Sequence, residues 1–305
     1  MKNIVILFLL SGLLQAFEYN LEPQKITEDV YCFFGKLENI TKENGGNMVN
    51  TCFVQTKEGF VVIDSGPTYA YAAQAYEQMQ HIAKLPVKYV INTHDHDDHW
   101  LGNSFYKDKG ALLIGPRTYE ENTLSGMETR MHSTLGDVLF AKTKIVKLDR
   151  IVDNNFTLKI ADDIFDISQP TKIAHTKGDL LIYFPRKKVV FTGDLLFNGR
   201  LTSLRDGSII GSLKALDSIE RYDADFIVGG HGYDTSKHAT KQFVSYLSEI
   251  KTKVLDALDN DVDMDEITKK VSMPAYKNMK LYDILHARNV LDAYKELEMI
   301  EDEEE

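Results

Sequence analysis

Residues 93–99 read Thr-His-Asp-His-Asp-Asp-His, which places three histidines and three aspartates within seven positions. A folded core does not tolerate so many ionisable groups unless they bind a metal ion. The apolar residues 87–92 directly before the cluster predict a β-strand. The cluster then lies on the loop that leaves a strand, where α/β proteins carry much of their chemistry. Because imidazole and carboxylate groups are metal ligands, the segment predicts a metal site with enough ligands for two ions.

The rest of the chain alternates short apolar runs with stretches of helical periodicity. The runs that predict strands are residues 30–34, 51–55, 60–64, 87–92, 156–160, 164–167, 180–184, 189–192 and 226–228. The stretches that predict helices are residues 69–84, 208–222, 243–258 and 281–297. Both halves of the chain supply strands and helices. We therefore expect an α/β fold in which two sheets pack face to face with helices outside, an αββα four-layer sandwich.

No linker rich in Pro, Gly or Ser divides the 305 residues. We expect one catalytic domain at about residues 28–240 and a helical C-terminal extension at residues 241–300. Residues 301–305 form an acidic tail, which we expect to be solvated and disordered.

The first 16 residues have the pattern of a secretory signal peptide, with Lys2, an apolar run at residues 4–14 and Ala16 at a cleavable end. The apolar run is too short to span a bilayer comfortably, so we expect no stable membrane insertion after the signal is removed. A retained signal anchor is the alternative. The sequence thus predicts a periplasmic or secreted protein.

The formal net charge of −11 argues against a nucleic-acid partner, because duplex binding depends on Lys and Arg that neutralise phosphates. We expect a small-molecule substrate and a monomer, with the apolar stripes of the C-terminal helices packed within the chain. Cys32 and Cys52 flank the glycine-containing loop 44–47. In an oxidising compartment they could form a cross-strand disulfide, and the equal alternative is two separate buried thiols.

Three more ligand-type residues follow apparent strands later in the chain. His175 follows residues 171–174, Asp194 follows residues 189–192, and His231 follows residues 226–228. Glycines adjoin all three, and glycine permits the tight turns and the close backbone approach that a crowded metal centre requires. Together with the cluster, these residues predict that up to seven ligands converge on one sheet edge.

In these residues the chain resembles the metallo-β-lactamase superfamily, whose pattern H-x-H-x-D-H is followed by a distant His, an Asp and a final His. The matching residues are His94, His96, Asp98, His99, His175, Asp194 and His231. Residues 64–66 and 175–179 also look like accessory motifs of that superfamily. The resemblance covers residues 30–231 and implies the fold expected above.

The resemblance implies two metal ions and a hydrolytic reaction. His94, His96 and His175 would hold one ion, Asp98, His99 and His231 the other, and Asp194 would bridge them. We expect two Zn²⁺, although iron or manganese would accept the same ligands. A hydroxide bridging the metals would attack the carbonyl of an ester, thioester or lactam-type bond, with Asp98 as the ligand on which catalysis most depends.

Asp194 narrows the choice among the relatives that the resemblance suggests. Dedicated β-lactamases of the superfamily lack this bridging aspartate, so we expect at most a weak β-lactamase activity. Residues 193–200, 203–207, 281–283 and 286–290 look like exported zinc metallohydrolases associated with quinoprotein relay systems and sulfur oxidation. A glyoxalase II-like thioesterase, a mononuclear iron persulfide dioxygenase and a non-catalytic zinc-binding protein remain alternatives. Arg200 and Arg205 either bind an anionic substrate group or form structural ion pairs.

Other residues near the motif receive structural interpretations. We expect Asp95 and Asp97 to be solvated rather than ligands, with a hydrogen bond to a ligating imidazole as the alternative. We expect Trp100 to pack beside the site. The remaining histidines are expected to be ordinary surface or core residues: His81, His132, His238 and His286.

Overall fold

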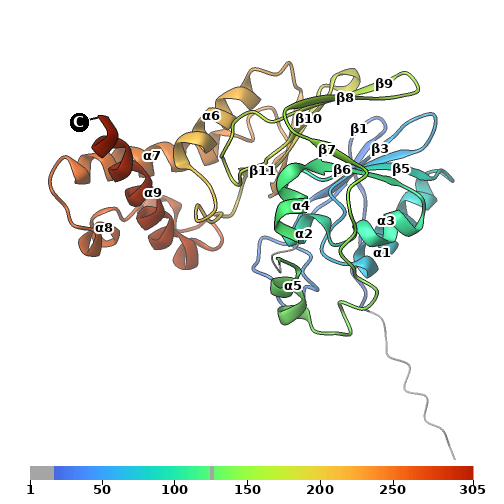
Figure 1. Cartoon of the computed structure of the whole chain (residues 1–305), viewed down its shortest axis with the longest axis horizontal. Coiled ribbons are helices and arrows are strands. Elements are labelled where there is room, and N and C mark those ends of the chain that lie inside the picture. The colour runs from blue at the N-terminus through green and yellow to red at the C-terminus, as the bar shows by residue number, and fades with distance from the viewer. Residues whose placement is uncertain (1–16, 124–126, 305) are drawn as a thin grey trace, which may run out of the picture.

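The computed structural model describes residues 17–123 and 127–304, so the expected signal peptide at residues 1–16 lies outside the described part of the chain. Two β-sheets pack against each other, and helices cover their outer faces (Figure 1). The predicted αββα sandwich with C-terminal helices is thus confirmed. Within the described ranges, no helix is both long and apolar enough to cross a membrane.

The first sheet has seven strands in chain order. They are β1 (Gln24–Thr27), β2 (Val30–Phe33), β3 (Thr51–Gln55), β4 (Phe60–Ile63), β5 (Val87–Ile91), β6 (Leu112–Pro116) and β7 (Arg150–Val152). Pairing is antiparallel from β1 to β4 and parallel from β4 to β7. The direction changes at β4 because helices connect the later strands, and such crossovers bring the chain back parallel. The carboxyl ends of β4, β5 and β6 therefore meet at one edge.

The second sheet has five strands in the order β12-β11-β10-β9-β8. They are β8 (Asn155–Ile160), β9 (Asp163–Ser168), β10 (Leu181–Phe184), β11 (Val189–Phe197) and β12 (Phe226–His231). Strands β8 to β11 are antiparallel, whereas β11 and β12 are parallel and are connected through α6 (Ile209–Glu220). Ser208 caps this helix by accepting a hydrogen bond from the Gly211 amide at 2.9 Å.

Strand periodicity explains how the sheets stack. In β3, Cys52 and Val54 face the second sheet, and the intervening Phe53 packs against the outer helices. The layer between the sheets is apolar on both sides: Ile63 and Ile91 come from the first sheet, and residues such as Phe165, Ile182 and Phe191 from the second. Both sheets thus bury two faces, which requires helices outside each of them.

Helices α1 (Tyr69–Ile82) and α3 (Asn103–Asp108) cover the outer face of the first sheet. Thr68 caps α1 by accepting a hydrogen bond from the Tyr71 amide at 3.0 Å, and Tyr71, Ala75 and Met79 lie on its buried face at intervals of four residues. The short α2 (Asp97–Trp100), α4 (Arg117–Thr123) and α5 (Met127–Leu135) lie near the sheet edge that carries the ligand-type residues.

The outer face of the second sheet packs against α6 and α7 (Lys241–Leu258), followed by α8 (Met264–Lys270) and α9 (Tyr282–Glu304). The apolar stripe predicted at residues 243–258 is buried in this layer, including Phe243, Leu247, Ile250 and Val254. Short 3₁₀ helices occur at Pro185–Lys187 and Pro274–Tyr276. Helix α9 continues through residues 301–304, where the sequence predicted a disordered tail.

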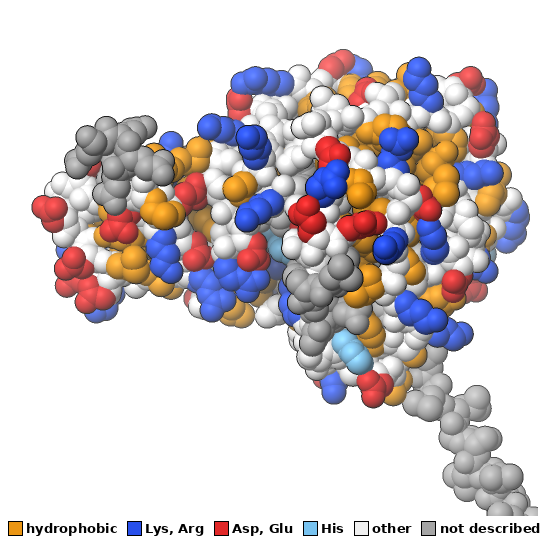
Figure 2. Space-filling model, in the orientation of Figure 1, with side chains coloured by type: hydrophobic (Ala, Val, Ile, Leu, Met, Phe, Trp, Pro, Cys, Tyr) orange, Lys and Arg blue, Asp and Glu red, His pale blue; other side chains and the backbone are white. Residues whose placement is uncertain are grey.

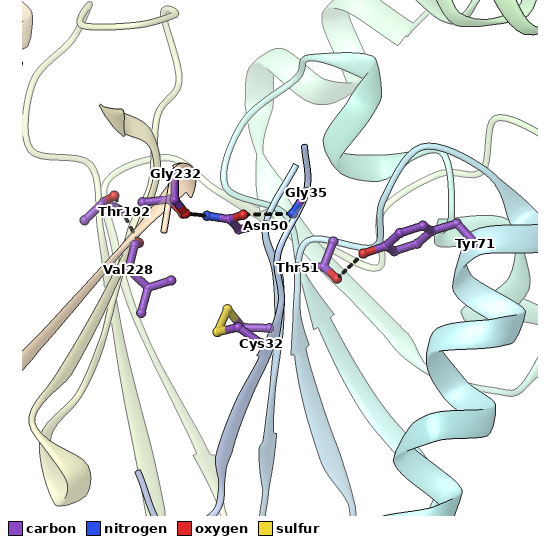
Figure 3. Close-up of a disulfide and its surroundings, with 10 residues drawn as sticks. Cys32, Gly35, Asn50, Thr51, Tyr71, Thr192, Val228 and Gly232 are labelled. Carbon is purple, nitrogen blue, oxygen red and sulfur yellow. Dashed lines mark hydrogen bonds between the residues drawn. A yellow bond between two sulfur atoms is a disulfide. The ribbon is translucent and has the colours of Figure 1, made fainter. Parts of the chain in front are cut away.

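Cys32 and Cys52 face each other on the antiparallel strands β2 and β3 and form a disulfide (Figure 3). Both sulfur atoms lie in the apolar layer between the sheets. Two residues before Cys52, Asn50 reaches across to the second sheet, where its Nδ2 donates to the carbonyl oxygens of Gly229 and Gly232 at 3.0 and 2.7 Å. Of the two alternatives predicted from the sequence, the structure contains the disulfide.

The structure differs from the predicted elements at several points. The elements that were not predicted are strands β1, β6 and β7 and helices α2, α3, α4, α5 and α8. Strand β11 continues through residues 193–197, beyond the predicted end at residue 192. Residues 171–174 form no strand, because the Ala174 amide donates to the Thr176 carbonyl oxygen and closes a local turn.

Candidate metal centre

The seven ligand-type residues predicted from the sequence converge at the edge where β5, β11 and β12 end. His94 and His96 lie on the loop after β5, and Asp98 and His99 lie in α2. His175 comes from the loop between β9 and β10, Asp194 from within β11, and His231 is the last residue of β12. The ligand atoms form two groups, and within each group they lie within 4.8 Å of one another.

The first group consists of His94, His96, His175 and Asp194. His175 Nε2 lies 2.9 Å from His96 Nδ1 and 3.2 Å from Asp194 Oδ2. His94 Nε2 lies 3.7 Å from the same carboxylate oxygen. The three imidazoles thus point their nitrogens at one location beside Asp194 Oδ2.

The second group consists of Asp98, His99 and His231. His231 Nε2 lies 3.5 Å from Asp98 Oδ2, and His99 Nε2 lies 3.7 Å from it. The other oxygen of Asp194, Oδ1, lies 3.2 Å from His99 Nε2 and 3.3 Å from His231 Nε2. Asp194 therefore directs one oxygen to each group, which is the arrangement expected of a bridging ligand.

Three buried atoms in the two groups fit a metal rather than a hydrogen-bonded network. His94 Nε2, His99 Nε2 and Asp194 Oδ1 are buried and have no hydrogen-bond partner among the described residues. Leaving such atoms unsatisfied costs about 1–3 kcal/mol each, so a fold retains them when a ligand satisfies them. His94 Nε2 lies 3.7 Å from Asp194 Oδ2, and His99 Nε2 lies 3.7 Å from Asp98 Oδ2, distances that are too long for hydrogen bonds. Nitrogen and carboxylate donors of this kind suit zinc, iron or manganese.

Electrostatics at the centre favour carboxylates in their anionic form. Burial raises the pKa of Asp194, but the imidazoles of His231, His99 and His94 outweigh it and hold that pKa well below its usual value. Burial acts on Asp98 in the same way and is outweighed by His99, His231 and Arg130. Burial, with the nearby His99, lowers the pKa of His94 and keeps its imidazole neutral, as metal binding requires.

Asp64, which follows β4, orients the ligand loop, by which we mean residues 93–99. Its backbone φ of 57° turns the chain so that Oδ1 accepts the Thr93 amide at 2.8 Å. Oδ2 accepts from Thr93 Oγ1 and from His99 Nδ1, both at 2.8 Å. Because Nδ1 of His99 is used as the donor, Nε2 is left as the ligand atom.

Main-chain contacts orient His231, and glycines make room for it. His231 Nδ1 donates to the Met48 carbonyl oxygen at 2.5 Å, so Nε2 again faces the centre. The Asn50 amide donates to the Gly230 carbonyl oxygen at 2.7 Å, which fixes the residue before His231. A Cβ atom on Gly230 would lie 2.1 Å from Asp194 Oδ1, so only glycine fits between these two ligands.

The predicted solvation of Asp95 and Asp97 is wrong, because both side chains are buried. Asp97 Oδ1 accepts from Arg130 Nε at 2.8 Å, and its Oδ2 accepts from the Met131 amide at 3.1 Å. Arg130 Nη2 also donates to Asp98 Oδ1 at 3.1 Å, which leaves Oδ2 directed at the second group. No local pattern predicted a role for Arg130, because this residue lies about thirty residues from Asp98 on the unpredicted helix α5.

Trp100 and His286 have the structural roles that the sequence predicted. Trp100 is fully buried and donates from Nε1 to the Asp95 carbonyl oxygen at 2.8 Å, so it is a packing residue beside the site. His286 is a buried core residue that contacts Tyr246 and the Val271 carbonyl oxygen at 3.1 and 3.0 Å. Neither residue has a ligand geometry.

A pocket of about 460 Å³ opens directly above both groups. Its volume suits a small organic substrate. Arg200 lines this pocket and is buried, whereas Arg205 is exposed and donates to its neighbour Asp206 from Nη2 at 2.6 Å. Asp206 in turn lies 3.6 Å from His96 Nε2, on the side of that ring away from the first group. The structure thus brings together all seven predicted ligand residues and both arginines, and their roles stay predictions.

Comparisons with known proteins place this geometry in a family. The model of the metallo-beta-lactamase superfamily matches residues 44–231. The chain is 25% identical over 213 residues to metallo-beta-lactamase type 2 from Elizabethkingia meningoseptica, a match that covers 67% of this chain and 77% of that protein. It is 29% identical over 150 residues to a hydroxyacylglutathione hydrolase from Brucella anthropi, a match that covers 48% of each chain.

A solved structure of a stereoselective inverting sec-alkylsulfatase from Pseudomonas sp. superposes with a TM-score of 0.67 at 17% identity, covering 90% of this chain and 50% of that one. The chain therefore spans about half the length of the hydroxyacylglutathione hydrolase and of the alkylsulfatase. The superfamily model matches more than half of the chain, and the motif residues meet at one sheet edge. The chain belongs to the metallo-β-lactamase superfamily.

Proposed function

We propose that this protein is an exported binuclear zinc hydrolase that cleaves an ester, thioester or lactam-type bond. The observation that carries the proposal is the position of Asp194, whose two oxygens lie 3.2 Å from His175 Nε2 and 3.2 Å from His99 Nε2. A carboxylate shared between two groups of imidazoles is suited to two ions held side by side. Two bound zinc ions would supply a hydroxide at neutral pH and stabilise the oxyanion that forms on the attacked carbonyl.

The residues of the chain have separate tasks in this proposal. His94, His96 and His175 hold the first ion, Asp98, His99 and His231 hold the second, and Asp194 contacts both. Asp64 and Arg130 do not bind metal but fix the orientation of His99 and Asp98. Arg200, buried at the pocket wall, binds an anionic group of the substrate.

Thioester hydrolysis is favoured within this class by the similarity to hydroxyacylglutathione hydrolases, named for cleaving such glutathione conjugates. The similarity to a type 2 metallo-beta-lactamase keeps a weak β-lactam activity within the proposal. Export is supported by the signal-like first 16 residues and by the Cys32–Cys52 disulfide, because disulfides persist in oxidising compartments.

Elemental analysis of the purified mature protein, combined with a hydrolysis panel, tests the proposal. The panel contains thioesters, lactones, β-lactams, phosphodiesters and an alkyl sulfate. We expect two zinc ions per chain and turnover of at least one carbonyl substrate. A single iron per chain would favour the persulfide dioxygenase alternative, and tightly bound zinc without any turnover would favour the non-catalytic alternative.

Asp98→Ala tests the ligand assignment within the same assays. We expect loss of the second ion and a fall in hydrolysis by orders of magnitude with the fold intact, because Asp98 lies in the short helix α2 at the sheet edge, outside the apolar core. Asp217→Ala, which removes an exposed carboxylate on α6, is the control and keeps both ions. Unchanged metal content and activity in Asp98→Ala would refute the assignment.

A further inference from the structure

Helix α9 is tied to the chain segment that leaves the metal centre. The Leu201 amide donates to the Lys280 carbonyl oxygen at 2.9 Å, and the Lys280 amide donates to the Gly199 carbonyl oxygen at 3.0 Å. Further along the helix, Asn289 Oδ1 accepts from the Leu204 amide at 3.1 Å, and its Nδ2 donates to the Thr202 carbonyl oxygen at 2.8 Å. These bonds make the start of α9 one wall of the pocket above the metal ligands.

That wall is mainly apolar. Leu281, Ile284 and Leu285 all line the pocket, and Arg288 of the same helix also lines it. The Ile284 side chain is 61% exposed, whereas Tyr282 and His286, two residues away on the opposite face of the helix, are buried in the C-terminal layer. A large aliphatic side chain that faces a functional pocket and lacks packing partners there offers apolar surface to a ligand.

Arg200 supplies a positive charge on the adjoining wall of the pocket. Only 7% of its surface is exposed, and no carboxylate of the described residues lies within ion-pair distance of it. Nε donates to the Leu201 carbonyl oxygen and Nη1 to the Glu38 carbonyl oxygen, both at 3.2 Å, and Nη1 also lies 3.4 Å from His231 Nδ1. Arg130 and Arg205, by contrast, are paired with aspartates. A buried guanidinium without an acid is costly unless an anionic ligand completes its environment.

Arg200 and the apolar wall are adjacent through the pairing of Arg200 with Lys280, the residue before Leu281. Figure 2 shows Lys and Arg side chains gathered on one face where the helical part at the left meets the body of the molecule. The pocket lining includes four arginines and three aspartates, although the whole chain carries a net charge of −11. When a site carries a charge opposite to that of the whole protein, its ligand is expected to carry a charge opposite to that of the site.

We propose, resting on the function above, that the substrate is an anionic amphiphile: its charged group binds Arg200 beside the metal centre, and its unbranched apolar chain lies along Leu281, Ile284 and Leu285 of α9. The helical extension is then a specificity element of the active site. The ligand class follows from the two walls together, because neither a purely polar anion nor a neutral lipid would contact both.

The test is calorimetric titration of the zinc-loaded mature protein with butanoate, hexanoate, octanoate and decanoate, each below its micelle concentration. We expect affinity to rise roughly two- to fourfold for each added methylene that the wall covers. Octan-1-ol, which has the same chain as octanoate without its charge, is expected to bind at least tenfold more weakly. An affinity that does not change with chain length would overturn the proposal.

The variant Ile284→Asn tests whether the apolar chain of the ligand lies along α9. Because Ile284 is exposed, the variant is expected to fold, to bind butanoate as the wild type does and to lose most of the gain from butanoate to decanoate. Met299→Asn is the matched control, since Met299 lies on the same helix, is also 61% exposed and is outside the pocket. An unaltered chain-length dependence in Ile284→Asn would reject the assignment to α9.

The variant Arg200→Gln tests where the charged group of the ligand binds. It is expected to weaken the binding of all four carboxylates by the same factor. If this buried substitution prevents folding, titration of the metal-free protein with octanoate and octan-1-ol decides the point instead, because no zinc ion is then present to bind the carboxylate. The proposed function and this inference can fail separately. Hydrolysis of short esters without chain-length dependence would refute only the inference, whereas chain-dependent binding without any hydrolysis would refute only the proposed function.

Discussion

Asp64 Oδ2 accepts a hydrogen bond from His99 Nδ1 at 2.8 Å, and the other ring nitrogen of His99 lies 3.2 Å from Asp194 Oδ1. One aspartate from the end of β4 thus decides which nitrogen of His99 faces the centre. The same oxygen also accepts from Thr93 Oγ1, so Asp64 couples the start of the ligand loop to its last histidine.

Asp64→Asn is expected to weaken binding of the second metal ion about 10- to 100-fold. Asparagine tolerates the φ of 57° at this position, but its amide NH₂ cannot accept from both Thr93 and His99. Zinc titration against a competing chelator measures the effect. Asp162→Asn makes the same chemical change at an exposed carboxylate and should leave both affinities as they are, so equal affinities in the two variants would contradict the role of Asp64.

Asn50→Ala is expected to lower the free energy of unfolding by about 2 kcal/mol and to weaken the second metal site. The variant removes the donors to the Gly229 and Gly232 carbonyl oxygens and the acceptor for the Gly35 amide (Figure 3). Urea unfolding of the metal-free protein measures the change in the free energy of unfolding, and zinc titration measures the change in affinity of the site that contains His231. If only stability changed, Asn50 would hold the sheets together without positioning His231.

Removal of the disulfide by the pair Cys32→Ala and Cys52→Ala is expected to lower the free energy of unfolding by about 3 kcal/mol, because the bond closes a loop with a sequence separation of 20 residues. Both cysteines are buried, so a reductant should act on the native protein only slowly. Urea unfolding with and without a reductant measures both effects. A double variant as stable as the oxidised wild type would show that the bond adds nothing.

Stability is expected to fall as the pH rises above 10. Burial raises the pKa of Tyr19 to about 12, against the hydrogen bond to Thr68, from an ordinary value of 10.0. Because the folded-state pKa is the higher one, the stabilisation is complete below pH 10 and is lost as the pH rises through 12. For Tyr19 the loss is at most about 3 kcal/mol. Urea unfolding at pH 9 and pH 11 measures it, and Tyr19→Phe should reduce the difference between the two values.

Local patterns were sufficient for the longer elements. The predicted helices at residues 69–84 and 208–222 correspond to α1 and α6, because their apolar residues recur at helical spacing and Thr68 and Ser208 cap them. Strand β6 escaped prediction because its sequence Leu-Leu-Ile-Gly-Pro ends in two residues typical of turns, and β7 because it has only three residues. Asp194 was predicted to follow a strand, but β11 continues through it with an irregular register opposite β12.

The sequence by itself determined the ligand types, their order along the chain and the two layers of strands, because these depend on residue chemistry and on periods of two or 3.6 residues. Only the tertiary structure decided which side chains surround the ligands. Asp97 meets Arg130, Asp64 meets His99, and Asn50 meets the glycines on both sides of His231, across separations that no local pattern encodes. The same holds for α9, whose apolar residues look like a core stripe in the sequence, yet whose Ile284 faces the pocket once Lys280 pairs with Arg200.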